Sequence, residues 1–264
     1  MNVLTAINKK YLPYFAAMVR SLAENNPEEH TIYVATKEVT AEDVEQYRAF
    51  IPARVKIVPV QFCDDILQNA PTVKRWPKEI YYRLFAAQYL PAEVDRILYL
   101  DSDIIVKGNL AELYATPFDR DVFVATTNIH SKLFKWLILT KNGAKRGSVY
   151  ANTGVLLMNL KALREEQSVE GVLRYIRRRR WLLSLPDQDV VSALYGKRVR
   201  LVDNKVYNLS EREIKWNKRH KKENIDGEWV EKNAKIIHYL SRNKPWKEGY
   251  KGILKPWYDK YKVQ

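Results

Sequence analysis

The apolar positions of the first hundred residues follow two alternating patterns. Short runs of apolar and β-branched residues are typical of buried strands, and they predict strands at residues 3–7, 31–35, 55–60 and 97–100. Apolar spacing and a capping pattern at Thr40 and Asp43 predict helices at residues 11–23, 40–50 and 79–89. Strands that alternate with helices in this way indicate an α/β fold built on an open, mainly parallel sheet.

The second half of the chain continues this pattern less regularly. We expect strands at residues 122–126, 150–159 and 235–240, and helices at residues 168–180 and 187–195. Glycine and proline are scattered, and we find no repeat or low-complexity tract. The sequence therefore predicts one α/β domain over residues 1–244, followed by a basic and aromatic helical tail at residues 245–264.

Positive charge is concentrated in the second half. The net charge is +14, yet residues 1–140 carry 16 Lys and Arg against 17 Asp and Glu, and the remaining residues carry 29 against 14. Such a surface favours polyanionic partners, namely phosphates, an anionic membrane or nucleic acid. Aromatic residues alternate with lysines in the tail, at Trp246, Tyr250, Trp257, Tyr258 and Tyr261. This mixture is typical of an anchor at a membrane surface, and it also occurs in proteins that bind nucleic acid.

The chain contains one cysteine, Cys63, which excludes an internal disulfide and a zinc site built from several thiolates. The N-terminal residues lack the order of a signal peptide, and no segment has the roughly 18 apolar residues needed to span a bilayer. These features indicate a reducing compartment. We therefore expect a cytoplasmic protein that is soluble or peripheral on the inner face of the membrane.

The first candidate for chemistry is a pair of acids at the end of a predicted strand. Asp101 and Asp103 follow the apolar run 97–100 directly. Residues at i and i+2 of an extended chain point to the same side, so both carboxylates can face one hard cation such as Mg²⁺ or Mn²⁺. Open parallel sheets bind ligands at the carboxyl ends of their strands, where this pair is expected. The same pattern also occurs by chance in solvated turns, and the buried strand before it favours a metal site.

A second candidate lies near the end of the chain. His238 belongs to the predicted strand 235–240, where it is either a core histidine with one hydrogen bond or a metal ligand. Imidazole combined with carboxylates suits Mn²⁺. Arg242 and Lys244 follow closely, and their side chains are suited to phosphate oxygens.

The chain resembles glycosyltransferase family 8, the retaining enzymes that include bacterial lipopolysaccharide galactosyl- and glucosyltransferases and, more distantly, glycogenin. Six segments match in the order of the family, namely the first strand through Asn8, residues 82–84, 98–103, 152–156 and 187–189, and His238 with residues 244–246. The resemblance covers nearly the whole chain. It implies a GT-A-type fold, with an open mixed sheet and a Rossmann-like nucleotide-binding half. It also implies metal-dependent transfer of glucose or galactose from a UDP-sugar to a saccharide acceptor, with an α-linkage.

The resemblance also implies roles for individual residues. Asp101, Asp103 and His238 match the metal ligands of the family, for Mn²⁺ or Mg²⁺. Other positions of these segments would contact the donor: Thr5, Ala6 and Asn8 the uracil and ribose, Arg83, Ser102, Ser241 and Lys244 the phosphates or sugar, and Asn152, Asp187 and Gln188 the sugar. Two of them depart from the family, which commonly has Asp where this chain has Asn8 and Gly where it has Ser241. Asn152, Asp187 and Gln188 are the candidates for catalysis, because Gln188 lies near the reacting face of the anomeric carbon in this family. An amide is a poor nucleophile, and a same-face displacement with the leaving phosphate as base is the alternative.

Some of these residues also fit purely structural roles. Arg83 fits a solvated or ion-paired surface group, and Asp187 and Asp189 fit acids in the first turn of a helix. The alternative function is a polyanion- or nucleic-acid-binding protein that uses the basic second half, for which we find no zinc-finger or RNP motif. A metal phosphohydrolase is a third hypothesis. We favour the glycosyltransferase without a nucleic-acid partner, and we expect residues between 128 and 150 to contact a free, lipid-linked or protein-linked acceptor.

Overall fold

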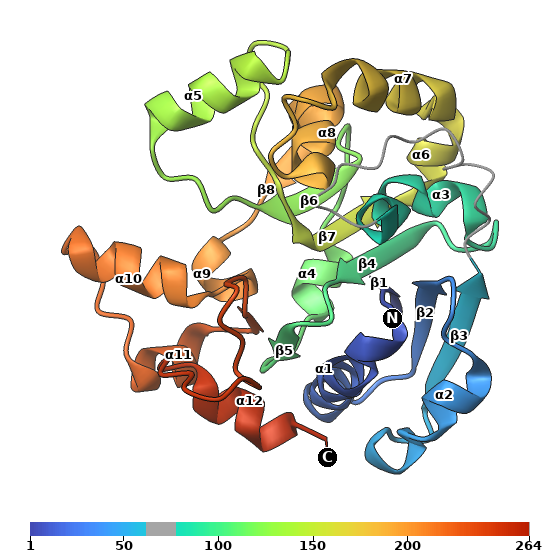
Figure 1. Cartoon of the computed structure of the whole chain (residues 1–264), viewed down its shortest axis with the longest axis vertical. Helices are drawn as coiled ribbons and strands as arrows, with labels where there is room; N and C mark the ends of the chain where they lie inside the picture. The colour runs from blue at the N-terminus through green and yellow to red at the C-terminus, as the bar shows by residue number, and fades with distance from the viewer. Residues whose placement is uncertain (62–77, 264) are drawn as a thin grey trace.

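The computed structural model describes residues 1–61 and 78–263, and its central element is a seven-stranded sheet (Figure 1). The strands of this sheet are β1 (Asn2–Ala6), β2 (His30–Thr36), β3 (Val55–Gln61), β4 (Arg96–Leu100), β6 (Phe123–Thr126), β7 (Asn152–Asn159) and β8 (Val199–Leu201). Their spatial order is β3-β2-β1-β4-β7-β6-β8. Neighbouring strands are parallel except in the two pairs that contain β7. The predicted open, mostly parallel α/β sheet is therefore confirmed.

A second, two-stranded sheet joins segments that are far apart in the chain. Its strands β5 (Ile104–Val106) and β9 (Ile236–His238) are antiparallel, and Ile104 lies opposite His238. The acidic pair connects β4 to β5, so this register brings His238 next to the acids. Two distant segments of the sequence thus meet at the carboxyl end of β4.

Helices cover both faces of the large sheet (Figure 1). The α-helices are α1 (Leu12–Asn25), α2 (Ala41–Glu45), α3 (Ala86–Tyr89), α4 (Ala111–Ala115), α5 (Lys132–Lys141), α6 (Leu160–Glu166), α7 (Val169–Arg179), α8 (Pro186–Tyr195), α9 (Asn204–Tyr207), α10 (Glu211–Arg219), α11 (Gly227–Asn233) and α12 (Lys255–Tyr261). Short 3₁₀ segments are η1 (Lys9–Tyr11), η2 (Arg48–Phe50), η4 (Lys78–Phe85) and η5 (Gly196–Arg198).

The sequence located seven of the nine strands of the described residues but only about half of the α-helices, and it misjudged two of the helices that it predicted. Thr40 and Asp43 form the expected capping box, yet α2 ends at Glu45 and η2 follows it. The helix expected at 79–89 is mainly the 3₁₀ segment η4, followed by the short α3. Both β1 and α8 pack on η4. An ordinary surface helix packs through a single apolar face, whereas η4 contacts two elements, and these tertiary contacts favour the 3₁₀ conformation here. Cys63 lies outside the described residues.

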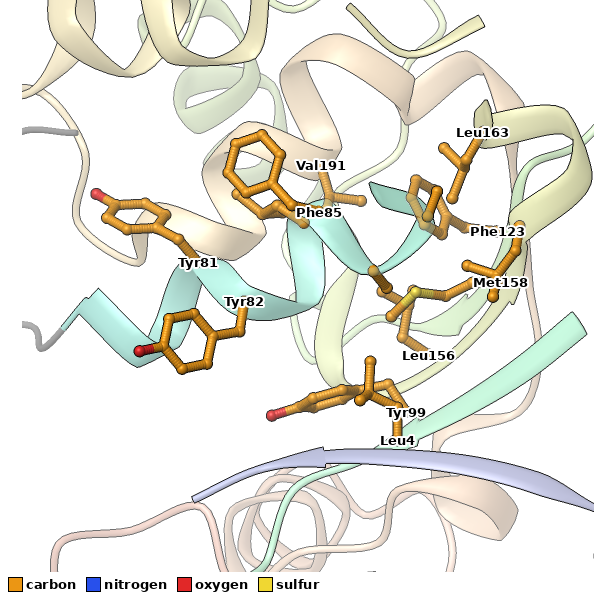
Figure 2. Close-up of a cluster of buried hydrophobic side chains, with 14 of the residues drawn as sticks. Leu4, Tyr81, Tyr82, Phe85, Tyr99, Phe123, Leu156, Met158, Leu163 and Val191 are labelled. Carbon is orange, nitrogen blue, oxygen red and sulfur yellow. The ribbon is translucent and has the colours of Figure 1, made fainter. Parts of the chain in front are cut away.

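Large buried side chains join η4 to the sheet (Figure 2). Figure 2 shows Leu4, Tyr99, Phe123, Leu156 and Met158 of the strands with Tyr81, Tyr82 and Phe85 of η4, Leu163 of α6 and Val191 of α8. A second cluster covers the opposite face, where α1 contributes Phe15, Met18 and Leu22. These two layers hold η4 and the end of β4 in fixed positions.

The aromatic residues of the C-terminal segment 245–264 are largely part of a third core cluster. Tyr250, Tyr258 and Tyr261 are buried with residues of α1 and β9, and Asn25 donates a hydrogen bond of 2.9 Å to the hydroxyl of Tyr261. Trp246 stacks on Tyr14 with ring centroids 3.6 Å apart. Three of the five aromatic rings of this segment therefore stabilise the interior, and its role at a membrane surface stays a prediction. Within the described part of the chain, no helix has the length and apolar character needed to cross a bilayer.

This packing makes a testable prediction about stability. Leu254 is fully buried in the third cluster, whereas the preceding Ile253 is 42% exposed. We expect Leu254→Ala to lower the free energy of unfolding by about 2–5 kcal/mol, because it leaves a cavity. Ile253→Ala is the matched control and should change this free energy by no more than about 0.5 kcal/mol. Urea unfolding measures both values, and equal small effects would show that the C-terminal segment does not belong to the core.

Candidate active site

Three potential metal ligands converge where β4 ends. One atom from each of Asp101, Asp103 and His238 lies within 4.8 Å of the other two. Nε2 of His238 is 3.1 Å from Oδ1 of Asp103 and 3.6 Å from Oδ2 of Asp101. Ligands bound at about 2.1 Å to one octahedral cation are about 3 to 4 Å apart, so these three atoms fit a single Mg²⁺ or Mn²⁺.

The outer oxygens of both carboxylates are held by positively charged side chains. Arg83 lies 3.0 Å from Oδ1 of Asp101, which also accepts a hydrogen bond of 2.8 Å from the hydroxyl of Tyr99. Lys244 pairs with Oδ2 of Asp103 and donates a second bond of 2.7 Å to the carbonyl of Tyr239. Each acid therefore gives one oxygen to a fixed partner and directs the other toward His238.

Burial and charge act in opposite directions on these groups. Burial by itself raises the pKa of Asp103, but the ion pairs and hydrogen bonds with His238 and Lys244 outweigh it and hold that pKa well below its usual range. Arg83 is also buried, which by itself lowers its pKa. The nearby acids Asp101 and Asp187 together have the larger effect, so the pKa of Arg83 is raised overall. Asp103 therefore stays ionised near neutral pH, as a ligand of a divalent cation must be.

A buried amide network fixes the ring of His238. Its Nδ1 lies 2.7 Å from Oδ1 of Asn208, while Nδ2 of Asn208 donates to the Asn152 side chain at 2.9 Å and to the Thr126 hydroxyl at 2.7 Å. Since this pattern directs the carbonyl oxygen of Asn208 at the ring, Nδ1 donates a proton to it. Nε2 is then the nitrogen left to face the carboxylates, and metal-binding histidines are typically oriented by a partner on the other ring nitrogen in this way.

Gly154 of β7 allows these groups to approach one another. A Cβ atom at this position would overlap Cε1 of His238 and lie only 2.7 Å from Oδ2 of Asp101. The amide of Asp101 also donates to the Gly154 carbonyl at 2.9 Å, which ties the acidic loop to β7. Glycine is required here for space, because no other residue leaves room for both side chains.

One cavity brings together most residues predicted to hold the nucleotide. It has a volume of about 290 Å³ and is lined in part by Ala6, Asn8, Arg83, Asp101, Ser102 and Asp103, and we call it the nucleotide-sized cavity. Thr5 is buried in β1 beside this group. The Thr5 hydroxyl and the side-chain amide oxygen Oδ1 of Asn8 are buried, and no described residue forms a hydrogen bond with them. Orphaned polar atoms of this kind fit a polar ligand in the cavity.

A larger cavity of about 760 Å³ contains two of the predicted sugar-contacting residues. Asn152 and Gln188 line it together with Phe134 and Leu137 of α5. Asp187 does not reach it, because its Oδ2 accepts a bond of 2.5 Å from Thr153 and lies 3.2 Å from Arg83. In this structure Asp187 positions Arg83 rather than lining the cavity.

The two basic residues after β9, Arg242 and Lys244, line one further cavity, whereas the neighbouring Ser241 does not. This third cavity has a volume of about 490 Å³, and it shares Tyr11 with the nucleotide-sized cavity and Arg242 with the large one. Ser241 lines none of these three, and its hydroxyl donates to the Asn243 carbonyl at 2.6 Å. The structure therefore joins Lys244 to the site through Asp103 but leaves Ser241 outside it.

The structure also shows the contacts of two residues whose roles the sequence left ambiguous. Arg83 is buried and bridges Asp101 and Asp187, so it is not a solvated surface group. Asp189 does act as an acid at a helix N-terminus, because its Oδ2 accepts from the amides of Ser184 and Leu185. Burial raises the pKa of Asp187, against the opposite effects of Arg83 and Thr153.

Sequence analysis missed Asn208 and Tyr99 as parts of this site. Tyr99 looks like an ordinary apolar strand residue, and only its hydroxyl contact with Asp101 reveals a further role. Asn208 lies between Tyr207 and Leu209 in no recognisable motif. The only signal in the sequence is a polar residue between two apolar ones. It indicates that Asn208 is buried, but it does not show which residue forms a hydrogen bond with it.

The fold and this site define the class of the protein. The structure superimposes on that of the galactosyltransferase LgtC, solved in complex with donor and acceptor sugar analogues, with a TM-score of 0.82 at 19% identity, over 99% of this chain and 95% of that one. GlyE from Streptococcus pneumoniae superimposes with a TM-score of 0.74 at 20% identity, over 100% of this chain and 61% of that one. The architecture is therefore the GT-A fold.

The family follows from the sequence. The profile of Glycosyl transferase family 8 matches residues 2–249, and the chain belongs to that family. The lipopolysaccharide 1,2-glucosyltransferase of Escherichia coli is 26% identical over 262 residues, which are 98% of this chain and 73% of that protein. The lipopolysaccharide 1,3-galactosyltransferase of Salmonella typhimurium is 26% identical over 258 residues, 93% of this chain and 72% of that protein. The chain is thus a glycosyltransferase of the hexosyltransferase class.

The close approach at Gly154 makes a prediction about metal binding. Gly154→Ala places a methyl group among His238 and Asp101 and should lower the affinity for Mn²⁺ by about tenfold or more. Titration followed by electron paramagnetic resonance of free Mn²⁺ measures this affinity. Gly227→Ala is the control, since a Cβ there meets no atom within 4 Å. Unchanged Mn²⁺ binding in a Gly154→Ala protein with wild-type circular dichroism would contradict the assignment.

Proposed function

We propose that this protein transfers glucose or galactose from a UDP-sugar to a saccharide acceptor, with retention at the anomeric carbon and with a divalent cation at Asp101, Asp103 and His238. The observation that carries the proposal is the convergence of two carboxylate oxygens and Nε2 of His238 on one point beside the nucleotide-sized cavity. Family membership supports the reaction class. The names of the lipopolysaccharide glucosyl- and galactosyltransferases support these two sugars.

The cavities suggest how the donor lies. The unsatisfied Thr5 hydroxyl and side-chain Oδ1 of Asn8 suit the base and ribose of uridine. From there the diphosphate would reach the acidic loop, with Lys244 able to leave Asp103 for a phosphate oxygen. The sugar would then extend toward Asn152 and Gln188 in the large cavity.

The bound cation would supply positive charge to the departing diphosphate. Asp101, Asp103 and His238 would hold it, and Arg83 keeps the carboxylate of Asp101 in place. The bond between the anomeric carbon and the diphosphate oxygen breaks as the acceptor hydroxyl attacks from the same face. The hydroxyl proton passes to the leaving phosphate oxygen. In this scheme Gln188 stabilises the positive charge on the sugar, because a neutral amide is a weak nucleophile.

The central test is release of UDP from UDP-glucose and UDP-galactose, with and without Mn²⁺. We expect release with at least one donor, dependence on the cation, and a loss of about 10² or more in rate for Asp103→Asn, which keeps the shape of the side chain. Asp119→Asn is a matched control, since this acid forms a surface pair with Arg200.

Three results would contradict the proposal. UDP release that does not depend on a cation would show that catalysis needs no metal ion. Undiminished Mn²⁺-dependent binding of UDP to Asp103→Asn would show that Asp103 is not a metal ligand. Binding to polynucleotides that falls steeply with salt and ignores both Mn²⁺ and Asp103 would favour a nucleic-acid-binding protein instead.

A second prediction separates the two roles considered for Gln188. If it only stabilises charge, Gln188→Ala should lower kcat by about 10² and leave the KM for the donor nearly unchanged. Steady-state UDP release measures both constants. An inactive Gln188→Ala enzyme, together with a trapped glycosyl adduct on the wild-type side chain, would instead show that Gln188 is a nucleophile.

A further inference from the structure

Helix α5 exposes an unusual number of large apolar side chains. Leu133 is 66% exposed, Phe134 54%, Trp136 60% and Leu137 49%, and no residue of the helix is fully buried. Leu133, Trp136 and Leu137 have the spacing i, i+3, i+4 and share one face. Figure 1 shows α5 at the edge of the molecule, away from the central sheet. An exposed apolar face of this size marks a site that contacts something else.

A neighbouring turn extends this surface. Trp181 is 86% exposed and Leu182 41%. The turn is held against the C-terminal end of α5, because Arg179 donates to the Lys141 carbonyl at 2.9 Å and Lys141 donates to the Ser184 hydroxyl at 3.1 Å. We call Leu133, Phe134, Trp136, Leu137, Trp181 and Leu182 the α5 patch.

The two stretches of sequence that contain the α5 patch carry charge of one sign. The sequence contains no Asp or Glu between Asp121 and Glu165, nor between Glu170 and Asp187. These two stretches include the whole patch, and they carry several cations, among them Lys132, Lys135, Lys145, Arg146, Arg178 and Arg180. Aromatic and leucine side chains that are flanked in the sequence by cations match the interface of an anionic membrane, where rings lie at headgroup depth and cations meet lipid phosphates.

The α5 patch also borders the large cavity. Phe134 and Leu137 line that cavity, and Gln188 lies in the same lining. The helix is anchored there, since Asn142 directly after it donates to buried Asp189 at 2.7 Å. A partner surface that contacts α5 would therefore lie next to the cavity that is lined by Gln188.

We propose that the α5 patch docks on an anionic membrane surface and presents the large cavity to an acceptor saccharide carried on a lipid. The presentation of the cavity to an acceptor rests on the proposed function, whereas membrane docking can be tested without sugar transfer. A second copy of the chain fits less well, because a symmetric contact would bring the cations of both patches together. The C-terminal segment is not the docking element, because most of its aromatic rings are buried.

The test is sedimentation of the full chain with vesicles of phosphatidylcholine, with and without an equal part of phosphatidylglycerol. We expect binding that requires phosphatidylglycerol and weakens with salt. The affinity of the double variant Leu133→Gln and Trp136→Gln for these vesicles should be lower by about tenfold or more, because two apolar side chains are lost from the interface. Neither residue lines the large cavity, so UDP release from the soluble donor should stay at the wild-type rate.

Matched controls use the same changes elsewhere. Leu201→Gln with Ile253→Gln replaces two apolar residues that are 37% and 42% exposed, and it should bind vesicles as the wild type does. Lys132→Gln with Lys135→Gln should weaken binding to phosphatidylglycerol vesicles, whereas Lys251→Gln with Lys260→Gln in the C-terminal segment should have little effect. Loss of binding in this last variant, with α5 variants unaffected, would overturn the proposal.

Two further results would overturn it. The wild-type protein failing to bind phosphatidylglycerol vesicles is the first. The second is sedimentation velocity showing that the wild type self-associates and that Leu133→Gln with Trp136→Gln makes it monomeric, which would assign the α5 patch to a second copy. Either result leaves donor hydrolysis untouched, so failure here is distinct from failure of the proposed function.

Discussion

The neutralisation of negative charge at the end of β4 is the constraint on which the site depends. Two carboxylates emerge from a buried strand, and an uncompensated acid in such a place costs several kcal/mol, of the order of 3–5 kcal/mol when one partner of a buried pair is removed. Arg83 compensates Asp101, and Lys244 compensates Asp103. Because these cations hold only the outer oxygens, the inner oxygens stay directed at His238. The arrangement thus fits the divalent cation that we propose for this site.

Several elements are needed to build this compensation, and each comes from a different part of the chain. The buried segment η4 carries Arg83, the antiparallel strand β7 passes Gly154 beside the acids, and the pairing of β5 with β9 brings His238 across. The C-terminal segment packs against α1 and β9 and so closes the layer behind His238. This explains why aromatic residues of that segment lie in the interior.

The uneven distribution of charge also acquires a structural meaning. The balanced first half forms the nucleotide-sized cavity and one wall of the metal site, where charges are paired individually. The basic second half contains α5 and the turn after α7, where the cations have no acidic residue in the same stretch of sequence. Lysines next to exposed leucine and tryptophan form a surface feature, and the net charge alone does not show where such a surface lies.

The sequence alone determined the class of fold, the order of most strands, and the three ligand candidates Asp101, Asp103 and His238. Local periodicity and a strand ending in acids are properties of neighbouring residues, so they can be read from the chain. Tertiary structure decided the rest. It made η4 a 3₁₀ segment, placed Asp187 behind Arg83, left Ser241 outside the site and brought in Asn208. It also buried most of the C-terminal rings and left those of α5 exposed. Burial and partner choice depend on which distant segments pack together, and no local pattern specifies that.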